Sequence, residues 1–110
     1  MPERVLFICS QNKLRSPTAE QVFSTWKTLE CDSAGLAPDA DVQLSTEQIE
    51  WAETIFVMER QHKNKLSRKF KAYLNNKRVI VLGIPDDYAF MEPSLVDLLQ
   101  RKVPPILRSS

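Results

Sequence analysis

The sequence has no apolar run near the roughly 20 residues that a membrane-spanning helix needs, and its first residues lack the basic region, long apolar segment and cleavage site of a secretory signal. We therefore expect no membrane contact and a location in the cytoplasm. There are two cysteines, Cys9 and Cys31, and one histidine, His62. Two thiols fit a reduced compartment better than a disulfide scaffold, and a lone histidine without closely spaced cysteines predicts neither a metal site nor a cofactor.

An excess of charge of one sign is also lacking, because fifteen Lys and Arg nearly balance fourteen Asp and Glu over 110 residues. Eight of these fifteen cations fall between Arg60 and Arg78. Apolar residues recur there at helical spacing, which favours an amphipathic helix with a solvated charged face over a surface for an anionic partner. Nucleic-acid-reading motifs are missing, so no nucleic acid is expected. The length predicts one domain spanning residues 1–110.

What the sequence does have is a strand, loop and helix suited to holding an oxyanion. Val5–Ile8 is an uninterrupted apolar run typical of a buried parallel strand, and Ser16-Pro17 predicts an N-cap followed by the first helical turn. Backbone N–H groups in such a turn converge on an anion, Arg15 adds a planar fork of donors, and Cys9 is held as a thiolate nucleophile. The expected phosphate-binding residues are Ser10, Gln11, Asn12, Lys13, Leu14, Arg15 and Ser16.

This stretch resembles the phosphate-binding loop of the low-molecular-weight protein tyrosine phosphatases, in the pattern Cys9-x-x-Asn12-x-x-Arg15-Ser16-Pro17-x-Ala19-Glu20. The resemblance continues into Ser33-Ala34-Gly35 and, more loosely, Val57-Met58-Glu59. It implies a phosphatase that works through a phosphocysteine intermediate, with Asn12 and Ser16 holding the loop in shape.

Two residues depart from the family pattern. Gln11 stands where the family usually has glycine, so it must tolerate whatever backbone angles that glycine supplied. Leu14 stands where the family often has a second cysteine, which removes a partner for a protective disulfide with Cys9.

Elsewhere the pattern alternates helices and strands, which predicts an α/β fold with a four-stranded parallel sheet flanked by helices, like that of the low-molecular-weight phosphotyrosine phosphatases. Ser45 and Gln48 have the spacing of a capping box. The expected helices are 17 to about 29, 45–51, 60 to about 74 and 94–103, with a turn at Asn75-Asn76. The later strands are 31–34, with Cys31 buried at its start, 54–58 and 79–82.

A phosphatase of this type also needs a general acid, which the family supplies from the loop before the last helix. The loop here offers Asp86, Asp87 and Glu92. Glu92-Pro93 matches the acid-proline order, but we favour the Asp86-Asp87 pair, with Asp87 slightly ahead because Tyr88 beside it provides a wall for an aromatic substrate. Glu59 and Arg60 are candidates for the rim of the site, although a helix start with solvated charges explains them more simply.

The preferred interpretation is a phosphomonoester hydrolase acting on a phosphorylated protein or a small aryl phosphate, with inorganic phosphate or sulfate also fitting the loop. The alternative is a phosphate- or phosphoprotein-binding module with weak or no turnover, favoured by Gln11 and by the absence of Asp-Pro. Arsenate reduction would have to use Cys31 as the resolving thiol. Arg15 argues against a phosphocarrier domain of sugar transport.

Overall fold

The core of the protein is a sheet of four parallel strands in the order β2-β1-β3-β4. The computed structural model describes residues 2–107. In chain order, the elements are β1 (Glu3–Cys9), α1 (Arg15–Phe23), β2 (Leu29–Gly35), α2 (Thr46–Trp51), β3 (Thr54–Val57), α3 (Arg60–Phe70), a 3-10 turn (Lys71–Tyr73), β4 (Arg78–Val81), α4 (Pro93–Lys102) and a second 3-10 turn (Pro104–Ile106). The predicted fold class is confirmed.

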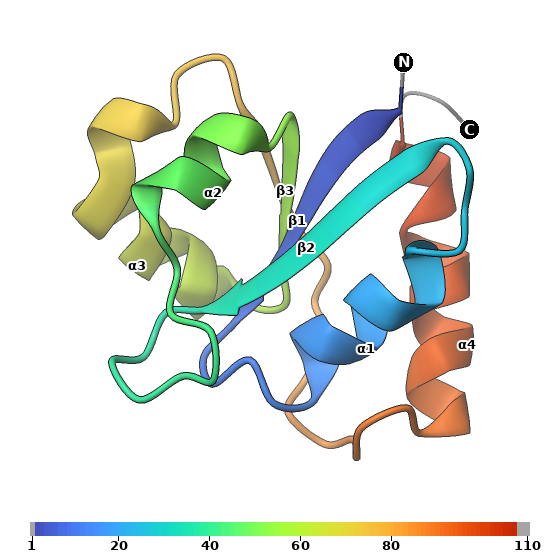
Figure 1. The fold of residues 1–110 in the computed structure, drawn as a ribbon. Helices are drawn as coiled ribbons and strands as arrows, with labels where there is room; N and C mark the ends of the chain where they lie inside the picture. The colour runs from blue at the N-terminus through green and yellow to red at the C-terminus, as the bar shows by residue number, and fades with distance from the viewer. Residues whose placement is uncertain (1, 108–110) are drawn as a thin grey trace.

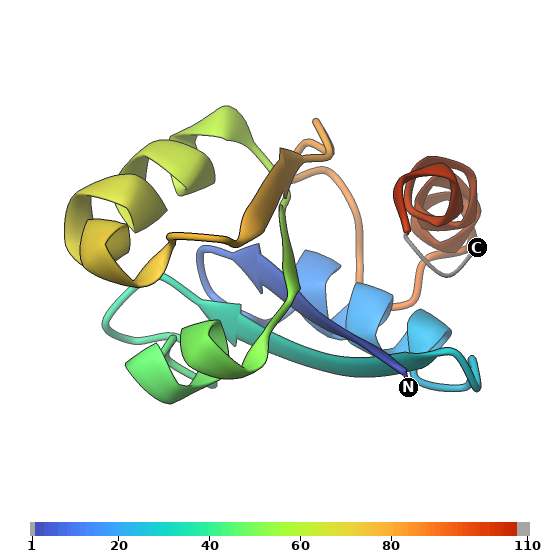
Figure 2. The same cartoon turned by 90° about the horizontal axis from the view of Figure 1, so that it is seen from above.

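Helices cover both faces of the sheet. Helices α1 and α4 lie on one face, and α2 and α3 lie on the other (Figures 1 and 2). The central strand β1 is apolar on both sides, so Phe7 stacks with Phe23 and Phe56 on the α1 side while Leu6 and Ile8 join the opposite cluster. This double burial is why the strand has no polar alternation.

Helix α1 is shorter than its apolar spacing predicts. It ends at Phe23, where the Ser24 N–H still donates to Glu20 O, rather than near Leu29. Leu29 instead opens β2, because it pairs with Glu3 in the register of the sheet. Trp26 keeps the predicted core role without being helical, since its ring packs edge-on against Phe23 at 5.2 Å.

Two predicted helix starts have different outcomes. The capping box is confirmed, because Ser45 Oγ accepts from Gln48 N at 3.2 Å and Gln48 Oε1 accepts from Ser45 N at 3.1 Å. The prediction of Ser16 as an N-cap is wrong. Helix α1 already begins at Arg15, its N-cap position is Leu14 without a side-chain bond, and the Ser16 hydroxyl has another use.

The loops that follow the strands gather at one end of the molecule, the lower end in Figure 1. They are residues 10–14 after β1, 36–45 after β2, Met58-Glu59 after β3 and 82–92 after β4. Ligands bind outside the carboxyl ends of strands in open parallel sheets, so this end is where a site is expected. Within residues 2–107, no helix combines the length and apolar character needed to cross a bilayer.

Candidate functional site

A small pocket lies at this end, between the loop after β1 and the loop after β4. Its volume is about 100 Å³, room for roughly three water molecules at their liquid volume. It is lined by Cys9, Ser10, Gln11, Lys13, Leu14, Arg15 and Asp86. Six of these seven residues come from the stretch that the sequence singles out, and Asp86 joins them from a distant loop.

The Cys9 thiol lies at the base of the pocket, at the last position of β1, with 3% of the residue exposed. Its Sγ is 2.9 Å from Ser16 Oγ and accepts from the Asn12 backbone N–H at 3.3 Å. Ser16 Oγ accepts from Asn12 Nδ2 at 3.0 Å, and its hydroxyl hydrogen has two acceptors within reach, Cys9 Sγ at 2.9 Å and Ala34 O at 3.5 Å, of which the sulfur is the nearer. Both contacts stabilise negative charge on Sγ.

The backbone of the loop is turned so that its N–H groups face the pocket. Three consecutive carbonyl oxygens, those of Cys9, Ser10 and Gln11, accept from Leu36 N at 3.0 Å, Ala37 N at 2.9 Å and Asp41 N at 3.0 Å. In a trans peptide the C=O and the following N–H point in opposite directions. The N–H groups of residues 10–12 are therefore directed away from the 36–41 loop and toward Cys9 and the pocket.

Asn12 holds this loop in shape from its centre. Its φ is +56°, a conformation that asparagine tolerates better than most residues, and its Nδ2 donates to Ser33 Oγ at 3.0 Å as well as to Ser16. Ser33 Oγ in turn donates to Glu20. Gln11 does not have a positive φ, so the strain expected from its replacement of glycine is not found.

Gly35 makes the close approach of the 36–41 loop possible. A Cβ at this position would lie 2.5 Å from Ser10 O and 2.6 Å from Ala40 Cβ, closer than real Cβ atoms come to such neighbours. Gly35 also pairs with Cys9 in the sheet register, so the position that requires glycine is directly beside the residue that carries the thiol. The Ser33-Ala34-Gly35 segment of the sequence pattern thus supports the anion loop from outside.

The Arg15 guanidinium is buried, with 4% of the residue exposed, and only one of its nitrogens is held by hydrogen bonds from the protein. Nη1 donates to Glu59 Oε1 at 2.8 Å and to Ile84 O at 2.7 Å. Among residues 2–107, Nε and Nη2 have no hydrogen-bond partner, and Nε lies 3.7 Å from Asp86 Oδ1. Two donors of a fixed fork are thus left for an anion in the pocket.

Glu59 is both at the start of a helix and beside the site, the two positions considered for it from the sequence. Its backbone is the N-cap of α3, and its carboxylate lies at the back of the site against Arg15. The hydrogen bond from Arg15 holds the pKa of Glu59 below its ordinary value, so the carboxylate stays charged. Arg60 is exposed as the first residue of α3 and does not line the pocket.

His62 is part of the site, which the sequence reasoning missed. It is 1% exposed, its Nδ1 accepts from Glu59 N at 3.0 Å, and its Nε2 lies 3.0 Å from Ser10 Oγ. The pKa of His62 is lowered to about 4, chiefly by burial and also by the nearby charges of Arg15 and Lys65, while Glu59 and Asp86 act in the opposite direction. The available signal was the i, i+3 spacing of Glu59 and His62 at a helix start.

The three candidate acids occupy different positions. Asp86 lines the pocket beside Arg15, with 67% of its side chain exposed, whereas Asp87 is not among the lining residues. Glu92 is the N-cap of α4, where its carboxylate accepts from Ser94 Oγ at 2.6 Å and Ala89 N at 3.1 Å. The hydrogen bond from Ser94 lowers the pKa of Glu92. The contacts of this carboxylate are therefore those of the helix start and not of the pocket. Of the two aspartates, the structure brings Asp86 and not Asp87 to the pocket.

Cys31 lies away from the pocket. It is the third residue of β2, half-buried rather than buried, and four residues before Gly35, the register partner of Cys9. At roughly 3.3 Å per residue, this places it about 13 Å along the sheet, too far for a disulfide. Burial, with the nearby charges of Glu20 and Asp32, raises the pKa of the Cys31 thiol to about 12. The arrangement offers no resolving thiol for arsenate reduction.

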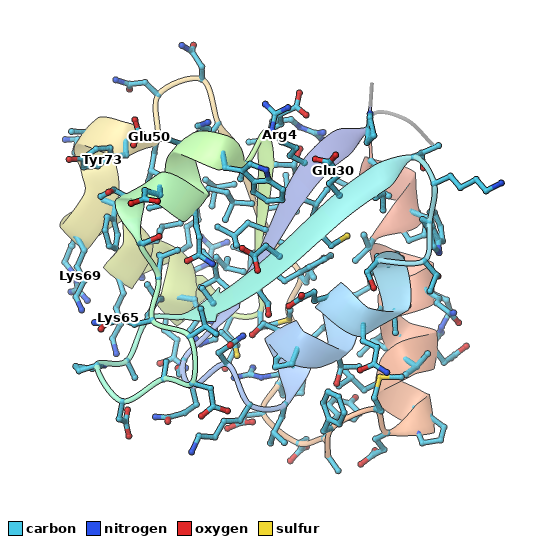
Figure 3. All side chains as sticks on the ribbon, in the orientation of Figure 1. Arg4, Glu30, Glu50, Lys65, Lys69 and Tyr73 are labelled. Carbon is cyan, nitrogen blue, oxygen red and sulfur yellow. The ribbon has the colours of Figure 1, made fainter. Side chains whose placement is uncertain are left out.

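The basic segment forms the exposed face of an amphipathic helix. Lys65 and Lys69 extend from α3 away from the sheet (Figure 3), whereas Leu66 of the same helix is fully buried. Across residues 2–107, no group of three His, Cys, Asp or Glu is arranged to hold a metal ion. The charged residues that line the pocket are Lys13, Arg15 and Asp86, and Glu59 pairs with Arg15 beside it.

Comparison with solved structures identifies the fold. The YwlE arginine phosphatase from Geobacillus stearothermophilus superposes with a TM-score of 0.73 at 22% identity, covering 91% of this chain and 90% of that one. The tyrosine phosphatase Wzb from Escherichia coli K30 in complex with phosphate gives 0.73 at 22%, covering 93% and 94%. Vibrio vulnificus Wzb in complex with benzylphosphonate gives 0.69 at 22%, covering 89% and 90%.

At this level of identity the likeness is one of fold, and the chain has the fold of the low-molecular-weight protein tyrosine phosphatases. No protein-family model matches the sequence, and a search of curated proteins finds no significant match.

Proposed function

We propose that this protein is a cysteine-dependent phosphomonoester hydrolase of the protein tyrosine phosphatase type. One observation carries the proposal: a buried cysteine thiol, two free guanidinium donors and a carboxyl group line the same small pocket. That set supplies a nucleophile, charge stabilisation and a proton donor for phosphoryl transfer. The neighbours of the same fold include tyrosine phosphatases with phosphate and with benzylphosphonate.

In the first step, the Cys9 thiolate attacks phosphorus opposite the leaving oxygen. An S–P bond forms, the P–O bond to the leaving group breaks, and the carboxyl group of Asp86 gives its proton to the departing oxygen. Arg15 Nε and Nη2, with the N–H groups of the loop, bind the equatorial oxygens where charge is held in the transition state. Ser16 stabilises the sulfur as thiolate before attack.

In the second step, water attacks the phosphocysteine. Asp86, now a carboxylate, takes a proton from the water, the S–P bond breaks, and inorganic phosphate and the Cys9 thiolate are released. Asp86 Oδ1 lies 3.7 Å from Arg15 Nε and 67% of the Asp86 side chain is exposed, so the attacking water has access to this carboxylate.

The substrate class we infer is an aryl phosphate such as phosphotyrosine. Cys9 is 3% exposed in a pocket of about 100 Å³, and this burial favours a phosphoryl group carried on a long side chain over one on a short side chain. Inorganic phosphate or sulfate fits the same donors. The fold is also shared with an arginine phosphatase, and comparing phosphotyrosine with phosphoarginine peptides decides between these leaving groups.

The test is release of nitrophenol from p-nitrophenyl phosphate between pH ~5 and ~8, with wild type and Cys9→Ser side by side. Turnover by wild type that is abolished in Cys9→Ser supports the thiolate mechanism, and acid quenching of a turnover reaction should trap phosphate on Cys9. If wild type is inactive while phosphate still raises its melting temperature, the protein is a phosphate-binding module and the phosphatase proposal is wrong.

A further inference from the structure

The only histidine of the chain is fixed in one tautomer. His62 Nδ1 accepts a hydrogen from the backbone N–H of Glu59 at 3.0 Å, so Nδ1 carries no proton of its own. The single ring hydrogen of a neutral imidazole must then be on Nε2. Nε2 lies 3.0 Å from Ser10 Oγ, and the ring therefore donates to the serine.

This tautomer sets the direction of the Ser10 hydroxyl. Since Ser10 Oγ accepts from His62, its own hydrogen has to point elsewhere, and within residues 2–107 it has no other hydrogen-bond partner. Ser10 follows the nucleophile Cys9 directly and lines the pocket. A hydroxyl donor is thus left available where an anion would bind.

The first turn of α3 holds both ends of the anion loop. The Glu59 carboxylate binds Arg15 at the far end of the loop, and His62 binds Ser10 at its beginning. The two contacts are joined through the capping box, in which the Glu59 backbone N–H donates to His62. The His62 residue is 1% exposed, so its ring has little access to solvent.

We propose that the Ser10 hydroxyl is a ligand of the bound phosphoryl group and that His62 is a positioning residue, which as its Nε2–H tautomer directs this hydroxyl into the pocket. The consequence for turnover rests on the proposed phosphatase activity, whereas the consequence for anion binding does not. The recognised chemistry is a tetrahedral oxyanion with one oxygen near Ser10.

The test is a double-mutant cycle on the affinity for inorganic phosphate, measured by calorimetry at neutral pH. The variants are Ser10→Ala, His62→Phe and the two together, with Ser24→Ala on the exposed end of α1 as a matched hydroxyl deletion. Each single variant should weaken phosphate binding by about tenfold, the effect of one hydrogen bond to a charged group. If His62 acts through Ser10, the double variant is no weaker than Ser10→Ala.

A spectroscopic measurement covers the case in which His62→Phe does not fold. In wild type labelled with ¹⁵N-histidine only one ring is observed, because the chain has a single histidine. We expect a neutral ring protonated on Nε2 whose Nε2 shift changes when phosphate is added, and no such change in Ser10→Ala. A proton on Nδ1, or independent losses of affinity that multiply in the double variant, overturns the proposal.

The outcomes separate this inference from the proposed function. If wild type turns over p-nitrophenyl phosphate normally but Ser10→Ala and His62→Phe show no coupling in phosphate affinity, only the proposed role of Ser10 and His62 is overturned. Coupled phosphate binding without turnover overturns the phosphatase proposal alone. Wild type that does not bind phosphate overturns both.

Discussion

Glu59 Oε1 lies 2.8 Å from Arg15 Nη1, so a carboxylate from the end of β3 fixes the guanidinium that β1 and its loop present. The same Nη1 also donates to Ile84 O at 2.7 Å. Removing the acceptor leaves a buried donor half-satisfied and frees the fork to rotate.

We therefore predict that Glu59→Ala lowers kcat/KM for p-nitrophenyl phosphate by about tenfold or more. Glu59→Gln should lose less, because its amide oxygen keeps the bond to Arg15. Steady-state kinetics on the two variants measure the difference, and Glu50→Ala, an exposed glutamate on α2 (Figure 3), is the control. Equal losses in Glu59→Gln and Glu59→Ala would contradict the geometric role and point to charge alone.

The two neighbouring aspartates should differ sharply. Asp86→Asn is expected to reduce kcat by about 10²-fold or more on phenyl phosphate, whose leaving group needs a proton, and by less on p-nitrophenyl phosphate. Asp87→Asn, the matched variant one residue away, should leave kcat nearly unchanged because Asp87 does not line the pocket. A larger loss of kcat in Asp87→Asn than in Asp86→Asn would show that Asp87 is the general acid.

Acid should destabilise the protein in a defined window. Below the ordinary pKa of 6.5 the unfolded chain binds a proton at His62, whereas the folded chain does so only near its lowered pKa of about 4. Stability is thus fully present above pH 6.5 and falls as pH drops toward 4, by on the order of 3 kcal/mol. Chemical denaturation at stepped pH measures this.

His62→Gln is the control for the acid window, since it removes the only side chain whose ordinary pKa, 6.5, lies between pH 7 and 5.5, above the ordinary pKa of 4.5 of glutamates such as Glu59. Its unfolding free energy should be nearly flat over that interval. At lower pH, protonation of Glu59, whose pKa is depressed by Arg15, destabilises both forms alike.

Gly35→Ala should disrupt the site without touching a charged group. Its Cβ would press on Ser10 O at 2.5 Å and Ala40 Cβ at 2.6 Å, so we expect a loss of about 1 to 3 kcal/mol in unfolding free energy together with weakened phosphate binding. Adding Ala40→Gly should not restore binding, because the clash with the backbone oxygen of Ser10 persists. Full rescue by Ala40→Gly would show that the loop carbonyl can move.

The two thiols should be distinguishable by alkylation. Burial keeps Cys31 protonated at neutral pH, with a pKa of about 12, and it should react slowly with iodoacetamide. Cys9 lines the pocket, so phosphate is expected to protect it. Mass spectrometry of peptides from treated protein measures both rates, and faster labelling of Cys31 than of Cys9 would contradict the assignment of the nucleophile.

The sequence was sufficient where a property depends on neighbouring residues. Cys9, Asn12 and Arg15 belong to one continuous turn, so their spacing predicts that they surround one site. The burial of β1 on both faces follows from its apolar run. The capping box involves only Ser45 and Gln48, three residues apart, so the sequence alone indicates it. The parallel sheet follows from the alternation of elements.

Properties that depend on long-range contacts were not predictable. Glu59 and His62 are more than forty residues from Arg15 and Ser10, and one sequence does not show which carboxylate or ring reaches across such a gap. The choice between Asp86 and Asp87 depends on which way a loop turns. Ser16 looked like an N-cap because its type and the following proline fit, but the helix begins earlier and the hydroxyl serves Cys9.

The hydrogen bonds that turn three loop carbonyls toward residues 36–41 have a consequence for the ionic state of any substrate. Carbonyl oxygens are ligands for hard divalent cations, and here they face away, while N–H dipoles and a guanidinium face the pocket. These carbonyls therefore offer magnesium no ligand, and among the lining residues only the carboxylate of Asp86 has a charged oxygen suited to the cation. A phosphoryl group held by the loop is thus neutralised by hydrogen-bond donors and not by a cation that the loop binds.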